Sequence, residues 1–220
     1  MSSTTLVGTL GALALASFLA TAASAATIRG VVLPPAVRTA SAERSPESVR
    51  NALCEAVVYL EEAPPKVEKK IAKKAAPVDT LVQKDHHFLP RVLPVAVGTR
   101  VRFENHDHIY HSVFSVSPAK RFDLGKHPPG QAGEVTFDRP GLVQLYCDID
   151  RAMAGFVFVT PNHLFVRPDP TGAFTFPKLP KGTYTVKVWH PRFGERTQTV
   201  EIPRKGDAVI ALSYDASPKP

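Results

Sequence analysis

Proline and glycine interrupt this sequence too often for long helices. The chain has 220 residues, of which 21 are proline and 13 are glycine, and the runs between them are rich in Val, Thr, Phe and Tyr. Short β-favouring runs separated by turn residues are typical of antiparallel sheets. With 44% hydrophobic residues, the chain can bury one or two cores. The sequence therefore predicts an all-β protein.

The first 25 residues have the pattern of a cleaved export signal. Leu6 to Ala20 is apolar but short for a membrane-spanning helix, and Ala23-Ser24-Ala25 offers the small residues after which signal peptidases cut. Residues 1–5 contain no Lys or Arg, so an uncleaved anchor stays as the alternative. No later segment is apolar enough to span a bilayer. We expect an exported, periplasmic protein with no stable membrane insertion.

The charge of the chain indicates what kind of partner it could attract. The formal net charge is +7, and a basic surface attracts acidic partners through a long-range, salt-sensitive force. The Lys and Arg residues are spread along the chain and do not alternate with an aromatic platform, so nucleic-acid binding is not expected. An acidic periplasmic redox protein is the expected partner.

The segment from Val101 to Val159 has potential metal ligands near its two ends. His111 begins a predicted strand, whereas Cys147 and Met153 lie on a short loop between two later predicted strands. An imidazole, a thiolate and a thioether are the ligands of soft metal sites, copper sites above all. The sequence therefore predicts a copper site made of His111, Cys147 and Met153.

Apolar and β-favouring runs, with a charged–apolar alternation in Arg100 to Glu104, predict several strands in the same region. The predicted strands are Val92 to Val97, Arg100 to Glu104, His111 to Val116, Glu134 to Phe137, Leu142 to Tyr146 and Phe156 to Thr160. The stretch from Pro118 to Gly133, which contains Pro128-Pro129-Gly130, is predicted to be a long irregular loop.

These motifs resemble those of cupredoxins, in particular the plastocyanin-like periplasmic proteins of the methylamine-utilisation type. The resemblance rests on VAVGTRVRFENHD, HSVFS, the Pro-Gly before a strand that ends in cysteine, and MAGFVFV, and it covers Leu81 to Thr160. It implies a Greek-key β-sandwich with a type 1 copper site and a one-electron carrier function. His111, Cys147 and Met153 take the positions of the first histidine, the thiolate and the axial thioether.

The loop departs from the cupredoxin pattern at one ligand position. The family pattern has a second histidine three residues after the cysteine, where this chain has Asp150. Three interpretations stay open. Asp150 could itself be a ligand, His106 or His108 could supply the second imidazole, or the metal site could be lost.

Alternatives without a metal exist for the same residues. Cys147 could be a buried thiol or could form a disulfide with Cys54, because exported chains favour disulfides, and Met153 could fill the core. Four other histidines are in turn-like or polar surroundings and are predicted to be surface residues: His86, His87, His127 and His163.

The last part of the chain carries a second resemblance. The pattern G-x-F-x-F-x-x-L-P-x-G-x-Y-x-V-x-V begins at Gly172 and is similar to carboxypeptidase regulatory-like, or transthyretin-like, β-sandwiches. Such modules open with two strands that Ile28 to Leu33 and Ala56 to Leu60 can supply. We therefore predict a second, smaller sandwich made by both ends of the chain, with the cupredoxin-like unit inserted between its strands.

The predicted organisation follows from these two resemblances. Residues 1–25 form the signal peptide, 26–64 and 161–220 the discontinuous smaller sandwich, and 81–160 the cupredoxin-like domain. Residues 65–80, which mix proline with charges and show no apolar period, are predicted to be a linker. The alternative is two consecutive domains, with Ala56 to Leu60 as the first cupredoxin strand.

The sequence contains no motif of a known catalytic site. It lacks the nucleophile elbow, the zinc protease motif and a phosphate-binding glycine loop, so no enzymatic activity is expected. The predicted function is that of a periplasmic copper-binding protein that transfers single electrons. The alternative is a non-redox structural or partner-binding module whose copper site is degenerate or made of histidines alone.

Overall fold

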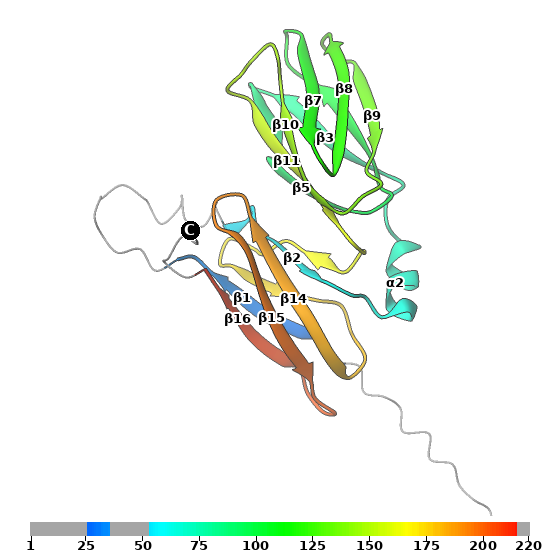
Figure 1. The fold of residues 1–220 in the computed structure, drawn as a ribbon, viewed down its shortest axis with the longest axis vertical. Coiled ribbons are helices and arrows are strands. Elements are labelled where there is room, and N and C mark those ends of the chain that lie inside the picture. The colour runs from blue at the N-terminus through cyan, green and yellow to red at the C-terminus, as the bar shows by residue number, and fades with distance from the viewer. Residues whose placement is uncertain (1–25, 36–52, 215–220) are drawn as a thin grey trace, which may run out of the picture.

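The computed structural model describes residues 26–35 and 53–214. The predicted export signal and most of the predicted loop from Pro34 to Arg50 lie outside these residues. Two β-sandwiches account for nearly all regular structure in the described part, with one short helix beside them (Figure 1). The prediction of an all-β protein is confirmed.

The central sandwich is formed by one continuous stretch of the chain. Its two sheets have the strand orders β5-β11-β10-β7-β8 and β4-β3-β6-β9. The strands are β3 (Val78–Lys84), β4 (His87–Leu89), β5 (Val92–Ala96), β6 (Arg100–Asn105), β7 (His111–Ser117), β8 (Lys120–His127), β9 (Ala132–Thr136), β10 (Gly141–Tyr146) and β11 (Ala154–Thr160).

The terminal sandwich combines strands from both ends of the chain. Its sheets have the orders β13-β1-β16 and β12-β2-β14-β15. The strands are β1 (Ile28–Leu33), β2 (Val57–Leu60), β12 (Phe165–Val166), β13 (Ala173–Thr175), β14 (Gly182–His190), β15 (Gly194–Ile202) and β16 (Ala208–Ser213). The segment Ala56 to Leu60, the first cupredoxin strand in the two-domain alternative, instead supplies β2, which pairs with β12 and β14.

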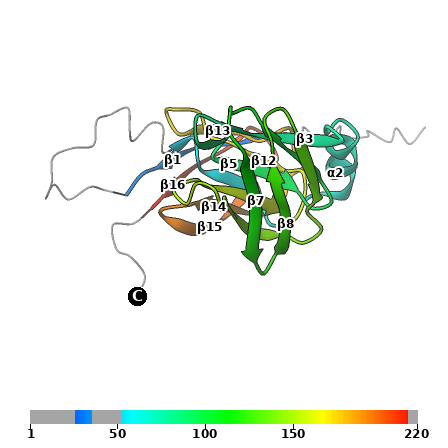
Figure 2. The ribbon, with the colours of Figure 1, turned by 90° about the horizontal axis from the view of Figure 1, so that it is seen from above.

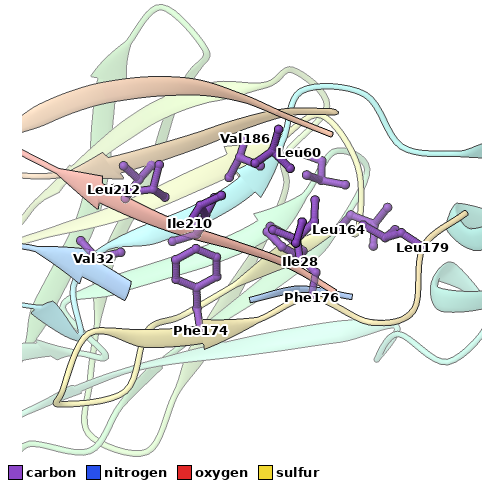
Figure 3. Packing of buried hydrophobic residues seen from close by; sticks show 14 of the residues in the cluster. Ile28, Val32, Leu60, Leu164, Phe174, Phe176, Leu179, Val186, Ile210 and Leu212 are labelled. Carbon is purple, nitrogen blue, oxygen red and sulfur yellow. The ribbon is translucent and has the colours of Figure 1, made fainter. Parts of the chain in front are cut away.

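Each sandwich encloses its own apolar core. In the terminal sandwich, β16 buries every second residue, Ala208, Ile210 and Leu212, against the facing sheet, as the two-residue period of a strand requires. Figure 3 shows Ile210 and Leu212 of β16 packed with Phe174, Ile28 and Val186 from neighbouring strands. The two sheets are therefore held together by interlocking alternate side chains.

A third apolar cluster joins the two sandwiches. Val57 and Tyr59 of β2 and Trp189 of β14 pack against Val92 and Phe158 of the central sandwich. The Trp189 ring stacks on Phe158 with 4.7 Å between ring centroids. These side chains alternate along their strands with residues of the two cores, which is why all four residues of β2 are buried.

Helix α2 (Pro65–Ala72) lies where the sequence predicts a linker, and β3 begins within the same range. Pro65 is at the first helical position, where its missing amide hydrogen costs nothing. Val67 and Ile71, one turn apart, pack against the core of the terminal sandwich. Two apolar residues are too few to show a period in the sequence. Figure 2 shows α2 at the right-hand side of the molecule.

Strand β8 lies within the predicted irregular loop from Pro118 to Gly133, so that prediction is wrong. Its side chains alternate between exposed and half-buried, and none is fully buried. Among the described strands it pairs with β7 alone, at the edge of its sheet, where charged residues are common. Such a strand lacks the strong apolar signal on which the strand predictions depended.

No membrane-crossing helix occurs within residues 26–35 and 53–214, because none has the necessary length and apolar character.

Candidate metal centre

Asn105 shapes the bend that precedes His111. The buried side chain of Asn105 donates through Nδ2 to the carbonyl oxygens of Ile109 and His127, both at 2.9 Å. Its Oδ1 accepts the backbone amide of Asp107 at 3.0 Å. These bonds fix residues 106–110 in one conformation, so Asp107 and His111 face each other across the bend.

Asp107 determines which nitrogen of His111 carries a hydrogen. His111 Nε2 lies 2.7 Å from Asp107 Oδ2, and its side chain is fully buried. Partial burial of Asp107 opposes ionisation, but hydrogen bonds from the His86 amide, the His111 ring and the Asp85 amide keep the pKa of Asp107 below its usual value. An ionised carboxylate only accepts. His111 therefore donates through Nε2, and Nδ1 is the nitrogen whose lone pair could bind a metal ion.

The thiol of Cys147 lies beside that lone pair. Cys147 follows the last residue of β10, and its Sγ is 3.5 Å from His111 Nδ1. The backbone amide of Ser112 points at the same sulfur, with 3.4 Å between nitrogen and Sγ. Ser112 Oγ accepts the amide of Asp148 at 2.7 Å, which fixes the start of the loop. The sulfur thus lies between a backbone amide donor and an imidazole nitrogen.

Met153 ends the same loop. It is 2% exposed and belongs to the apolar core cluster that includes Cys147. Its backbone amide bonds to the carbonyl of Asp150 at 3.1 Å, which closes a turn just before β11. The loop between β10 and β11 thus begins with a buried thiol and ends with a buried thioether.

Two of the other predicted ligands have polar partners outside this pair. Asp150 Oδ2 is bonded to His86 Nδ1 at 2.8 Å. His106 is exposed and turns its Nε2 to Glu104 Oε2 at 3.0 Å, and His108 is exposed on the same bend. Among the residues that the structure describes, no group of three or more His, Cys, Asp and Glu side chains is placed to hold a metal ion.

The disulfide alternative is wrong. Cys54 and Cys147 are both free thiols. Cys54 is half-buried beside β2 of the terminal sandwich, and its carbonyl accepts from Arg167 at 3.2 Å. Cys147 lies in the core of the central sandwich. The thiol next to His111 is therefore not part of a disulfide and could bind a metal ion.

His86 is a member of this site that the sequence does not reveal. It was predicted to be a surface histidine, and its side chain is indeed 58% exposed. Its ring nevertheless lies perpendicular to that of His111, with 5.8 Å between centroids. The β3–β4 turn carries it there because Gly155 lets Phe88 of β4 pack against β11, where a Cβ would lie 2.8 Å from that of Phe88. No sequence signal links residue 86 to residue 111.

The donors at the centre of the site fit a soft metal ion. Imidazole and thiolate ligands suit copper, and a thioether suits Cu(I) in particular. The His111 lone pair faces Cys147 Sγ, and both side chains are buried. Cys147 contacts His111, and His111 contacts Asp107. A cysteine nucleophile, its general base and the acid that orients the base make the same series of contacts in an enzyme. A buried sulfur gives a substrate no access, so the arrangement suits binding better than turnover.

Comparison with known proteins gives partial similarities only. No protein-family model matches the chain, and no curated protein matches it. A copper-containing nitrite reductase from Thermus scotoductus SA-01 is 28% identical over 37% of this chain, with a TM-score of 0.36. The match covers 22% of the length of that enzyme.

Two small copper-protein folds are also similar to part of the chain. A purple cupredoxin from Nitrosopumilus maritimus is 22% identical, with 37% of this chain and 99% of that protein covered and a TM-score of 0.34. A Cu(I) form of an amicyanin variant is 23% identical, with 40% and 88% covered and a TM-score of 0.36.

Proposed function

We propose that this protein binds copper between His111 and Cys147 and acts as a one-electron carrier. The observation that carries the proposal is the 3.5 Å distance between His111 Nδ1 and Cys147 Sγ. Both side chains are buried. Such a pair of an aromatic nitrogen and a thiol selects copper over harder metals. A bound copper ion would take up and release one electron as it alternates between Cu(I) and Cu(II).

The protein residues would hold the ligands in place during this exchange. Asp107 fixes the His111 ring through Nε2, and the Ser112 amide supports negative charge on Cys147. Met153, at the end of the same loop, would act as the weak axial thioether. The ligands come from the ends of packed strands, so little reorganisation would accompany electron transfer.

The position of Asp150 and the lack of a preassembled group of three ligands among the described residues favour a second candidate. In that case the central sandwich is a non-redox structural or partner-binding module with a degenerate site. The two candidates make opposite predictions for Cys147, because only the first needs a metal–sulfur bond.

The proposal extends to location and partners. The signal-like residues 1–25 support export to the periplasm. The formal net charge of +7 supports an acidic redox partner. We further propose that the terminal sandwich is a transthyretin-like domain that carries the cupredoxin-like domain as an insertion, since strands from both chain ends share its sheets.

Copper titration of the purified chain from residue 26 tests the function. Addition of Cu(II) should produce a thiolate-to-copper charge-transfer band, which should disappear in Cys147→Ser. The matched control is Cys54→Ser, which removes the other free thiol and should leave the band unchanged. A colourless wild-type protein, or a band that survives Cys147→Ser, contradicts the proposal. Loss of the band in Cys54→Ser would also contradict the proposal.

A further inference from the structure

The turn between β3 and β4 is held in a strained conformation next to the candidate metal centre. Its two residues, Asp85 and His86, have φ values of 50° and 60° although neither is glycine. Two left-handed residues are what a two-residue hairpin turn requires. Strain of this kind persists where the surroundings hold it in place, and it often accompanies a functional site.

Asp107 holds this turn against the centre. Its Oδ1 accepts the amide of Asp85 at 2.6 Å, and its Oδ2 accepts the amide of His86 at 3.1 Å. The same Oδ2 accepts from Nε2 of His111 at 2.7 Å. One carboxylate therefore fixes both the backbone of His86 and the ring of His111.

Asp150 holds the side chain of His86 from the opposite loop. Its Oδ2 lies 2.8 Å from His86 Nδ1, and its Oδ1 accepts the amide of Ala152 at 3.0 Å. With Nδ1 bonded to the carboxylate, Nε2 is the ring nitrogen that has no part in this contact. This is the arrangement of metal-binding histidines, whose second nitrogen donates to a carboxylate. Nε2 of His86 is thus the nitrogen available to a metal ion.

The spacing of the two imidazoles is compatible with one shared ion. A metal–nitrogen bond of about 2 Å puts a ring centroid about 3 Å from the ion, so two imidazoles on one ion have centroids at most about 6 Å apart. The centroids of His86 and His111 are 5.8 Å apart and their rings are perpendicular.

We propose that His86 supplies the second imidazole ligand of the copper site, through Nε2, and that Asp150 positions it instead of binding the metal. The inference rests on the proposed copper binding at His111 and Cys147. Asp150 occupies the sequence position of the missing histidine. In this proposal its carboxylate positions the imidazole of His86, which comes from another hairpin. Among the described residues no group of three His, Cys, Asp and Glu ligands is preassembled, so copper binding would draw the exposed His86 ring toward Cys147 while Nδ1 keeps its contact with Asp150.

The test is to count imidazole ligands by pulsed electron paramagnetic resonance on the Cu(II) protein. The variant His86→Gly removes the ring and suits the positive φ of the turn. The matched control is Asp85→Gly, which makes the same backbone change one residue earlier without removing an imidazole. Wild type and control should show two imidazoles, and His86→Gly should show one. Added free imidazole should restore the second signal in His86→Gly.

Further variants test the role of Asp150. Asp150→Asn should weaken copper binding by about 10- to 100-fold, as loss of an orienting carboxylate does. In the His86→Gly background, Asp150→His should restore two imidazoles. If His86→Gly folds poorly, Asp150→Asn still tests the proposal, because this substitution leaves the β3–β4 turn intact. An unchanged copper affinity in Asp150→Asn overturns its positioning role.

Failure of this inference is distinguishable from failure of the proposed function. Wild-type protein with the thiolate-to-copper band but only one imidazole, or two imidazoles that survive His86→Gly, overturns the role of His86 alone. Wild-type protein without the band overturns both.

Discussion

Replacement of Asp107 by alanine tests the arrangement around His111 without any metal. In the folded protein the carboxylate of Asp107 accepts hydrogen bonds from the His111 ring and from the amides of Asp85 and His86. The His111 side chain has no exposed surface. Removal of the carboxylate therefore leaves a buried ring nitrogen without its partner, whereas water can reach the two exposed amides.

The expected loss of stability follows from these three bonds. A buried donor without a partner costs about 1–3 kcal/mol, and an exposed hydrogen bond exchanged for one to water costs about 0.5 kcal/mol. The total is about 2–4 kcal/mol. For a chain of this size each kcal/mol lowers the melting temperature by about 2–4 °C. We expect Asp107→Ala to lower Tm by at least about 4 °C.

Scanning calorimetry of the copper-free protein measures this change. The control is Asp138→Ala, which removes an exposed carboxylate that pairs with Lys120 at 3.1 Å in the same sandwich. Its effect should be a small fraction of the first, because exposed ion pairs contribute little. A Tm for Asp107→Ala within about 1 °C of wild type would refute the account of how His111 is oriented.

Two further predictions concern the rest of the molecule. Trp189→Ala removes the ring stacked on Phe158 between the sandwiches; loss of such a buried ring costs about 3–5 kcal/mol. We expect calorimetry to show two separate transitions, and an unchanged thermogram would argue against this interface. A thiol reagent should modify half-buried Cys54 in the native copper-free protein and Cys147 only after unfolding in guanidinium. Equal rates for the two thiols would show that Cys147 is not buried.

Strands with a strong apolar signal could be predicted from the sequence. The run from Val92 to Val97 became β5, and Leu142 to Tyr146 lies within β10. Elements with a weak apolar signal were missed. Strand β8 is stabilised by its hydrogen bonds to β7. Helix α2 packs against the terminal core through Val67 and Ile71. In each case the stabilising contacts lie between segments, which a local pattern does not contain.

The candidate metal centre also has residues that the sequence indicates and residues that it does not. His111, Cys147 and Met153 stand out by residue type and loop position, and the structure places the first two side by side. The role of His86 depends on a turn conformation, on Asp107 and on Asp150, three features that lie far apart in the sequence. No alternation or spacing rule connects these positions. Only the folded chain reveals that Asp150 faces a histidine from another hairpin.

X-ray absorption at the copper edge tests the central claim most directly, because it reports the atoms bound to the metal. Protein loaded with a single equivalent of copper should show one short copper–sulfur bond together with scattering from imidazole rings. In Cys147→Ser that short sulfur bond should be absent. A copper environment of nitrogen and oxygen atoms alone in the wild-type protein would contradict the claim that Cys147 and His111 form the metal site.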